Sequence, residues 1–468
     1  MGLPETAVKE SKDRVRGAII NSQFEFPIRR ITINLAPADL PKEGGRFDLA
    51  IALGILHASS QLELPSFEEF EFVGELALSG ELRPVSGLLP IAIQANKNNR
   101  TLIVPQQNGA EAALIKGLQV YTAEHLLEVC AFLKGEKKLL TAEAIKVENQ
   151  HIYSTCLSDI RGQQRAKRAL EIAAAGRHSL LMRGSPGTGK TMLASRLVTI
   201  LPDMNEDEAE EVAAIRSICG ESVNPENWQL RSVRVPHHTA SAVALVGGGS
   251  YPKPGEISLA HNGVLFLDEL PEFSRKVLEV LREPLESGKI VISRAAKQAE
   301  FPASFQLIAA MNPCPCGYWG DVKNNCRCTS EQVQRYQNKL SGPFLDRIDM
   351  HIEVPSLSHK DLQESSTTIE TSQEVKKRII AAQERQKKRR SHNNAYLTNK
   401  EIEQDCHLSE QNQLVLRKTM EKMRLSARAY HRVLKLARTI ADLESSEDIQ
   451  LHHLTESISY RKVDSLFT

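Results

Sequence analysis

Short apolar runs alternate with longer amphipathic stretches along the whole chain, and this pattern predicts an α/β protein. In the first part of the chain, helices are predicted at residues 7–20 and 49–57, and strands at 30–35, 72–76 and 101–105. Farther along, apolar runs at residues 179–182, 264–269 and 307–312 predict further strands. Continuous apolar runs of this kind are typical of parallel sheets buried on both faces.

Changes in this pattern divide the chain into five segments. A mixed α/β domain at 1–135 is followed by a polar linker at 136–155 and a second α/β unit at 156–355. A strongly charged helical connection follows at 356–394, and a helical domain with apolar positions at helical spacing covers 395–468.

The turn after the apolar run at 179–182 has the G-x-x-x-x-G-K-[ST] pattern of a phosphate-binding loop. Its residues are Gly184, Ser185, Pro186, Gly187, Thr188, Gly189, Lys190 and Thr191. The glycines let backbone N–H groups surround phosphate oxygens, and the start of the helix that follows favours an anion. Lys190 is predicted to reach the β and γ phosphates of ATP, and Thr191 to bind Mg²⁺. A chance glycine-rich turn is the weaker interpretation because both the strand and the helix are present.

A second apolar strand ends in two acidic residues, Asp268 and Glu269. Strand ends of a parallel sheet meet at one edge, so these carboxylates are expected beside the phosphate loop. Asp268 is predicted to hold Mg²⁺ and Glu269 to polarise the attacking water. The sequence therefore predicts an ATP-hydrolysing site.

Composition and charge limit the other classes of function. The 468 residues are 41% hydrophobic and 25% charged, which is ordinary for a soluble globular protein. The net charge of +1 does not indicate nucleic-acid binding by the whole surface, so any basic patch must be local. No apolar run has membrane-spanning length and no signal peptide opens the chain, so a cytoplasmic location is expected.

Four of the eight cysteines fall within one short loop, at Cys314, Cys316, Cys326 and Cys328. Four thiolates match the ligand number of a structural zinc site, although C-x-C spacing is tighter than the common spacing. Zinc would hold a loop that is too small to form its own core. Free thiols in a reducing cytosol are the alternative.

Three further segments resemble the sensor and finger regions of AAA+ ATPases. Asn312 resembles the first sensor, and the alternative is a strand-end asparagine that makes a turn. Arg347 resembles the arginine finger, which acts on a neighbouring subunit, but a pair with Asp346 or Asp349 is the alternative. Arg428 resembles the second sensor, and Arg432 is the other candidate on the same helical face.

Together with the residues 311–317, Met-Asn-Pro-Cys-Pro-Cys-Gly, these motifs resemble the magnesium-chelatase-like AAA+ family. The resemblance covers nearly the whole chain and implies an AAA+ core with a helical lid. Within the family, the chain resembles members associated with bacterial competence. This resemblance implies a hexameric ring that moves along DNA and acts as a branch-migration helicase during transformation.

The first domain resembles the C-terminal domain of Lon-type proteases through residues 40–45, 74–80 and 84–88. Arg46 stands where that family has its serine nucleophile, and Leu89 where it has its lysine base. A Ser–Lys peptidase needs both groups, so a non-proteolytic scaffold for ring assembly or DNA contact is expected. The chain begins where such a domain would already have its first strands, so an unpaired strand edge is expected.

Basic residues in two predicted insertions are candidates for DNA contacts. Residues 288–297 predict a hairpin with a basic tip, and Lys289, Arg294 and Lys297 are the candidate phosphate contacts. A solvated hairpin is the alternative. The stretch at 231–253 is predicted to be an inserted loop or helix that reaches toward a pore.

Three functions follow from these residues. The leading hypothesis is an ATP-driven DNA motor. The second is a chelatase subunit that drives metal insertion into a tetrapyrrole, and the third is a non-proteolytic protein-remodelling ATPase. DNA-stimulated ATP hydrolysis discriminates the first from the other two.

Overall fold

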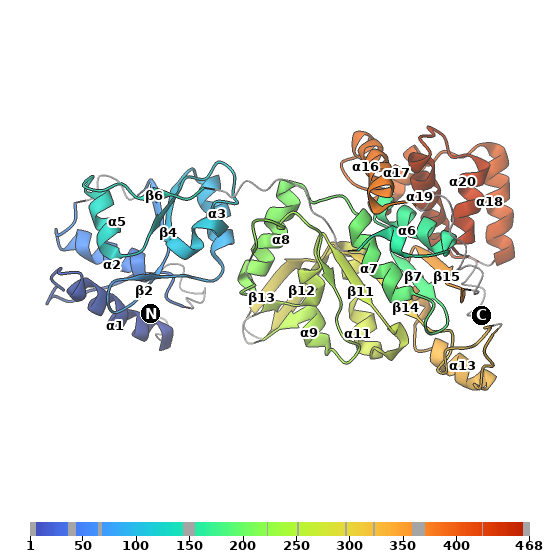
Figure 1. The fold of residues 1–468 in the computed structure, drawn as a ribbon, viewed down its shortest axis with the longest axis horizontal. Helices are drawn as coiled ribbons and strands as arrows, with labels where there is room; N and C mark the ends of the chain where they lie inside the picture. Colours follow the sequence, from blue (N-terminus) through green and yellow to red (C-terminus); the bar gives the residue numbers. More distant parts are fainter. Residues whose placement is uncertain are drawn as a thin grey trace. The chain divides into compact units, whose positions relative to one another are not determined.

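The computed structural model describes residues 6–35, 44–63, 68–143, 155–221, 223–249, 252–294, 297–321, 323–357, 370–423 and 425–461. The chain forms two compact units (Figure 1). The first comprises Met1–His151 and Asn205–Gln229, and the second comprises Ile152–Met204 and Leu230–Thr468.

The first unit is built on a sheet with the strand order β1-β4-β5-β6. Its strands are β1 (Phe70–Phe72), β4 (Thr101–Pro105), β5 (Val120–Ala123) and β6 (Leu140–Thr141). The first three are parallel and β6 is antiparallel. A two-stranded ribbon joins β2 (Glu75–Leu76) to β3 (Leu82–Arg83).

Two apolar clusters hold helices against this sheet. One contains residues of α1 (Thr6–Asn21), α2 (Asp48–Ala58) and α5 (Leu126–Leu133), and the other contains residues of α3 (Leu88–Lys97). The short α4 (Gly109–Ala112) also contributes to the second cluster. The helices predicted at 7–20 and 49–57 are therefore confirmed.

Three features of the first unit differ from the sequence prediction. Residues 30–35 form no strand, and Ile31 and Ile33 are exposed, so the alternating pattern there lacks a buried face. Residues Asn205–Gln229 interrupt the second unit in sequence but belong to the first unit in the fold. Their Ala213 and Val223 are buried in the same apolar cluster as Leu89. They contain α8 (Glu206–Ile218). In addition, β6 lies in the predicted linker, so the boundary at 135 is too early.

The second unit contains a parallel five-stranded sheet with the order β15-β7-β14-β11-β8 among the described residues. The strands are β7 (Leu180–Arg183), β8 (Val233–Arg234), β11 (Val264–Leu267), β14 (Gln306–Met311) and β15 (Met350–Glu353). Numbered along the chain, these strands have the order 5-1-4-3-2. All but one of the residues in β7, β11, β14 and β15 are buried, as the continuous apolar runs predict.

Helices cover both faces of this sheet. One cluster packs residues of α6 (Gln164–Gly176), α7 (Lys190–Ile200) and α16 (Ser372–Arg389) on one face. The cluster on the other face includes residues of α9 (Ala242–Val246), α10 (Glu256–Leu259), α11 (Arg275–Val280), α13 (Ser330–Gln337) and α14 (Gly342–Leu345). The α/β fold class is therefore confirmed.

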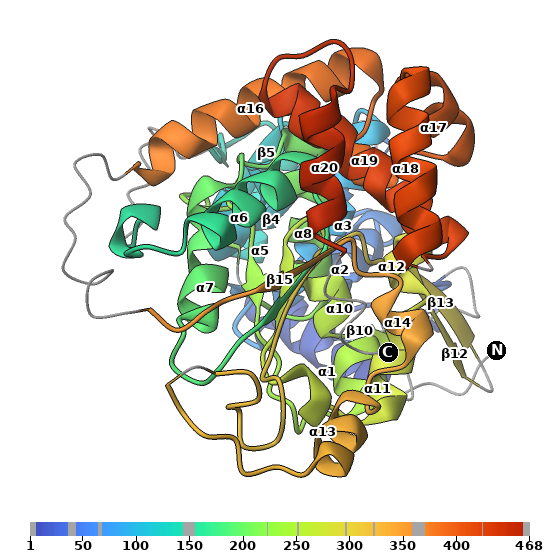
Figure 2. The ribbon, with the colours of Figure 1, turned by 90° about the vertical axis from the view of Figure 1, so that its right-hand side faces the viewer.

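The helical lid has its own core, formed by α17 (Asn399–Asp405), α18 (Glu410–Met423), α19 (Ala427–Leu443) and α20 (Leu451–Ser459). Figures 1 and 2 show these lid helices and α13 at opposite ends of the second unit. Among the described residues, no helix combines the length and apolarity needed to cross a membrane.

Candidate active site

The predicted phosphate loop joins the end of β7 to the start of α7. Gly187 and Gly189 have φ angles of 77° and 88°, a left-handed conformation that glycine adopts readily. The Lys190 ammonium donates to the carbonyls of Gly184 at 2.8 Å and Ser185 at 2.9 Å, and to Oδ1 of Asn312 at 3.2 Å. All three of its N–H donors are thus used, and Asn312 lies beside the loop lysine as the resemblance implies.

Two oxygen donors meet where a magnesium ion is predicted. The Thr191 hydroxyl donates to Oδ2 of Asp268 over 2.7 Å, although the two residues are 77 positions apart. Hydroxyl and carboxylate oxygens are the hard ligands that Mg²⁺ prefers, so these residues fit the ion. Burial lowers the pKa of Lys190, and the nearby Asp268 carboxylate opposes that shift.

Glu269 has a contact that sequence reasoning did not identify. Its Oε2 atom lies 3.2 Å from Nδ1 of His238, a residue that follows β8 in the loop beside β11. The Glu269 backbone is left-handed, with φ 51°, and its N–H donates to Oδ1 of Asp268 at 2.9 Å. Strained backbone of this kind is frequent at functional sites. The sequence feature that could have indicated this contact is a polar side chain just after β8, the strand that pairs with β11.

Arg347 lies at the opposite edge of the sheet from the phosphate loop. It precedes β15, which runs parallel to β7 with Met350 opposite Leu180, whereas Lys190 follows the end of β7. Both strands are four residues long, about 13 Å, so Arg347 and the phosphate loop lie at opposite ends of these two parallel strands. The side chain is 7% exposed and its guanidinium contacts Glu286 at 2.8 Å, not Asp346 or Asp349. A role on its own subunit's phosphates is therefore excluded by geometry.

The two candidates for the second sensor lie at the same edge as Arg347. Arg428 is 3.7 Å from the same Glu286 carboxylate and is half exposed. Arg432 instead pairs with Asp349 and donates to the Arg347 carbonyl at 2.7 Å. Both arginines therefore lie away from the phosphate loop of their own subunit, and the choice of Arg428 over Arg432 as second sensor stays a prediction.

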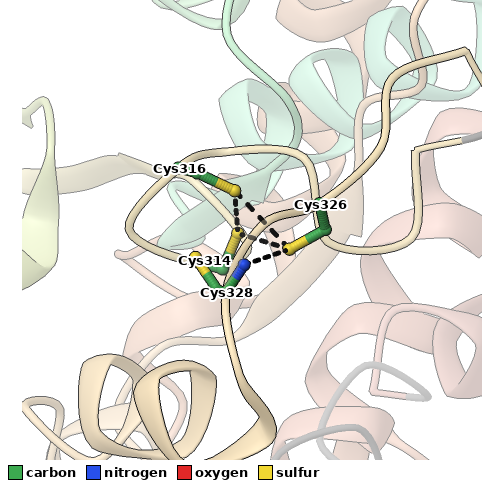
Figure 3. A group of neighbouring side chains, drawn as sticks. All are labelled: Cys314, Cys316, Cys326 and Cys328. Carbon is green, nitrogen blue, oxygen red and sulfur yellow. Dashed lines mark hydrogen bonds between the residues drawn. The ribbon is translucent and has the colours of Figure 1, made fainter.

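The four clustered cysteines converge in space (Figure 3). The Sγ atom of Cys314 lies 3.4 Å from that of Cys316 and 3.7 Å from that of Cys326, and Cys316 is 3.5 Å from Cys326. The Sγ of Cys328 lies within 4.8 Å of the others. A tetrahedral Zn–S distance of about 2.3 Å requires sulfurs about 3.8 Å apart, so the thiols fit zinc.

A second group of potential ligands, Glu444 with His452 and His453, does not fit a metal. Both histidine Nε2 atoms contact Oε2 of Glu444, at 2.8 and 3.0 Å. However, Nδ1 of His453 accepts a hydrogen bond from the Gln450 backbone. The neutral ring therefore carries its proton on Nε2, the atom that would have to bind the metal.

The predicted hairpin at 288–297 is present as β12 (Lys289–Arg294) paired with β13 (Lys297–Pro302). Lys289 is not at the tip: it lies opposite Pro302 at the base, and its ammonium pairs with Glu300 at 2.7 Å. Arg294 and Lys297 are opposite each other in the strand register, at the end farthest from Lys289. In the stretch at 231–253, Arg234 is also paired, with Glu256 at 2.7 Å.

The two positions that correspond to the Lon-type dyad lack its chemistry. A methyl group built on Gly87 would lie 3.7 Å from the Arg46 guanidinium, and Leu89 is fully buried in the apolar cluster. An arginine cannot act as a hydroxyl nucleophile and a leucine cannot act as its base.

Comparison with known proteins places these sites in a family context. Three family models match: "Subunit ChlI of Mg-chelatase" at residues 1–108, "Magnesium chelatase, subunit ChlI" at 156–362, and its C-terminal model at 369–461. Competence protein ComM of Haemophilus influenzae is 54% identical over 465 residues, which cover 98% of this chain and 91% of that protein.

Two further relatives define the range of similarity. The uncharacterized protein YifB of Escherichia coli strain K12 is 52% identical over 100% of this chain and 92% of its own length. The magnesium-chelatase 38 kDa subunit of Cereibacter sphaeroides is 26% identical over 33% of this chain and 52% of its own. The chain therefore belongs to the magnesium-chelatase-like AAA+ family, in the group that contains the competence protein ComM.

Proposed function

We propose that this protein is an ATP hydrolase that drives a hexameric DNA motor in the cytoplasm, and that it works as a branch-migration helicase during integration of transforming DNA. The observation that carries the ATPase part is the convergence of Lys190, Thr191, Asp268 and Asn312 at one edge of the sheet. These residues come from three strands and their following turns, and they supply the cation, the Mg²⁺ ligands and the polar sensor that phosphoryl transfer needs.

Each residue of the site would have its own role in hydrolysis. The phosphate loop would bind the phosphates through backbone N–H groups and Lys190, and Thr191 with Asp268 would hold Mg²⁺, which neutralises charge on the phosphates. Glu269 would orient and polarise the attacking water, and Asn312 would hold that water near the γ phosphate. Release of Glu269 from His238 would make its carboxylate available to the water.

The position of Arg347 supports an oligomeric ring. Because Arg347 lies at the edge opposite its own phosphate loop, it can contribute only to the site of a neighbouring subunit. In that role it would leave Glu286 and stabilise charge on the transferred phosphoryl group. Arg428 contacts the same Glu286 carboxylate, so a role for it as second sensor would also lie near a neighbouring subunit.

The proposal that the motor acts on DNA rests on the name of the ComM relative and on the β12–β13 hairpin. Competence is the uptake of DNA, and the relative matches nearly the whole chain. Arg294 and Lys297 lie at the end of the strand pair farthest from Lys289 and remain candidate phosphate contacts, whereas Lys289, paired with Glu300, is the weaker candidate. The first domain would serve as a scaffold for ring assembly or DNA contact, and the cysteine loop would hold a structural zinc ion.

The test is ATP hydrolysis by the purified protein with no DNA, single-stranded DNA and a four-way junction, each at two salt concentrations. Stimulation by DNA that weakens with salt supports the motor, and the strongest stimulation on the junction supports branch migration. The variants Lys190→Ala and Glu269→Gln should abolish turnover. Normal hydrolysis by both variants would refute the site, and brisk hydrolysis that ignores every DNA would refute the DNA part.

A chelatase-type motor is the second candidate because all three matching family models carry that description. It predicts ATP turnover that responds to a tetrapyrrole-metal insertion partner and not to DNA. The same assay separates the two candidates.

A further inference from the structure

We propose that the metal-loaded cysteine loop, residues 314–328, is the support that positions the phosphate loop, so that nucleotide binding depends on the metal. The inference rests on the zinc site of the proposed function and extends it. Gly317 and Asp321 would be positioning residues for the phosphate loop. The divalent ion, zinc or one with similar ligand preference, would keep the cysteine loop rigid.

The cysteine loop has little else to hold its shape. Among its described residues, 314–321 and 323–328, there is neither helix nor strand, and only Cys314 and Gly317 are buried. The backbone N–H of Trp319 donates to Sγ of Cys314 at 3.3 Å, and that of Cys328 donates to Sγ of Cys326 at 3.4 Å. Such N–H···S bonds orient thiolate ligands around a metal. A metal bonded to four sulfurs would therefore supply the rigidity that a core supplies elsewhere.

The loop makes two direct contacts with the phosphate loop. Gly317 faces Pro186 so closely that a methyl group at Gly317 would lie 2.5 Å from the proline Cδ. Its φ of 87° is also a conformation that favours glycine. The Ser185 side chain is also close enough to Asp321 to be the largest cause that lowers the pKa of that carboxyl group.

A third connection runs along the chain. Asn312, whose side chain accepts from Lys190, lies two residues before Cys314. The intervening Pro313 is itself held, because its carbonyl accepts from the buried Gln337 amide at 3.1 Å. The position of the first metal ligand is thus tied to the sensor asparagine and, through it, to the lysine that is predicted to bind phosphate.

These contacts involve Ser185 and Pro186, in the first half of the phosphate loop. A phosphate-binding loop works by preorganised backbone N–H groups, and displacement of one segment by less than 1 Å weakens several of those donors together. Loss of the metal would release Gly317 and Asp321 from their positions and remove that support.

Two glycines of the cysteine loop offer a matched pair of variants. Gly317 and Gly320 both have left-handed backbones, with φ of 87° and 78°, so alanine strains both. The added methyl meets Pro186 in Gly317→Ala, but it meets no described atom within 4 Å in Gly320→Ala. The difference between the variants therefore isolates the contact with the phosphate loop from backbone strain.

The experiment measures the affinity of the full chain for a fluorescent ATP analogue without DNA, together with zinc content per chain. We expect zinc near one per chain in the wild type and in both variants. Gly317→Ala should weaken nucleotide binding about tenfold, equivalent to ~1.4 kcal/mol, while Gly320→Ala stays within about twofold of the wild type. Asp321→Ala should weaken binding by a smaller factor. Equal affinity of the two glycine variants would overturn the proposal.

The second arm removes the metal from the wild-type protein with a high-affinity zinc chelator in the presence of excess Mg²⁺. Nucleotide affinity should fall at least as far as in Gly317→Ala and return when zinc is added back. Unchanged affinity after zinc loss, or a wild type without zinc, would overturn the proposal. Because no DNA is present, these results do not depend on whether the protein is a DNA motor.

Discussion

Nδ1 of His238 lies 3.2 Å from Oε2 of Glu269, so the predicted catalytic carboxylate is engaged by a histidine from the loop after β8. A carboxylate oxygen that accepts from the imidazole has one acceptor position fewer for the attacking water. We therefore expect the contact to make Glu269 less effective toward that water.

Removing the imidazole should raise the ATPase rate. We expect His238→Ala to increase turnover without DNA about threefold and to reduce any stimulation by DNA. The effect is smaller than the roughly tenfold expected from a charged hydrogen bond of ~1.5 kcal/mol, since Glu269 is half exposed. His237→Ala is the control, because that ring contacts His238 and Thr239 rather than Glu269. A lower rate in His238→Ala would mean that the histidine orients the base instead.

Arg347 should act only on a neighbouring subunit. Arg347→Ala is expected to bind ATP normally and to lose about a thousandfold in turnover, as for other arginine fingers. Mixing it with Glu269→Gln should restore turnover, since one subunit supplies Glu269 and the other supplies Arg347. A mixture of Lys190→Ala with Glu269→Gln is the control and should stay inactive, because both defects lie in the same half of the site. Failure of the first mixture would assign Arg347 to its structural pair with Glu286.

Asp349 should contribute stability that is lost in acid. Its carboxylate contacts Arg432, accepts from the Ser179 backbone at 3.0 Å, and lies 3.5 Å from His178. Burial by itself raises the pKa of Asp349, but Arg432 and His178 outweigh burial and hold this pKa well below its usual range. A depressed folded-state pKa contributes stability that is fully present above the unfolded value of about 3.9 and is lost progressively as pH falls from there through the folded-state pKa.

We therefore expect Asp349→Asn to lower stability at pH 7 by ~3 kcal/mol, because it leaves Arg432 without its buried partner. The difference in unfolding temperature from the wild type should shrink as pH falls from 5 toward 3. Asp346→Asn serves as the comparison, since Asp346 is 39% exposed and lies 3.6 Å from Arg461. Equal losses in the two variants would contradict the role given to Asp349.

Cys156 should be more reactive than the buried Cys130 and Cys406. Burial raises its pKa, but hydrogen bonds with Ser158 and Ser372 outweigh burial and lower the pKa to about 7. Burial raises the pKa of Cys130 and of Cys406 to about 12. Thiolate, not thiol, reacts with iodoacetamide, so alkylation of Cys156 should rise as pH increases through 7 while the other two stay unmodified. Mass spectrometry of metal-loaded protein tests this, and equal labelling of the three would refute it.

The sequence alone determined the elements that carry the ATP site. The glycines of the phosphate loop, the buried strand that ends at Asp268 and Glu269, and the apolar run before Asn312 are local patterns. Each specifies its own backbone through glycine conformation or through burial of a continuous apolar run. A parallel sheet then brings the strand ends to one edge, which is why Lys190, Asp268 and Asn312 were predicted together.

The tertiary structure decided which residues far apart in the sequence come into contact. Glu269 meets His238, Arg347 meets Glu286, and Gly317 meets Pro186, across 31, 61 and 131 positions of sequence. No local pattern specifies such pairs, since they depend on how loops from separate strands converge. The same reason applies to α8, whose amphipathic pattern is compatible with any apolar surface. Burial against α3 assigns it to the first unit, because only the folded chain brings those two surfaces together.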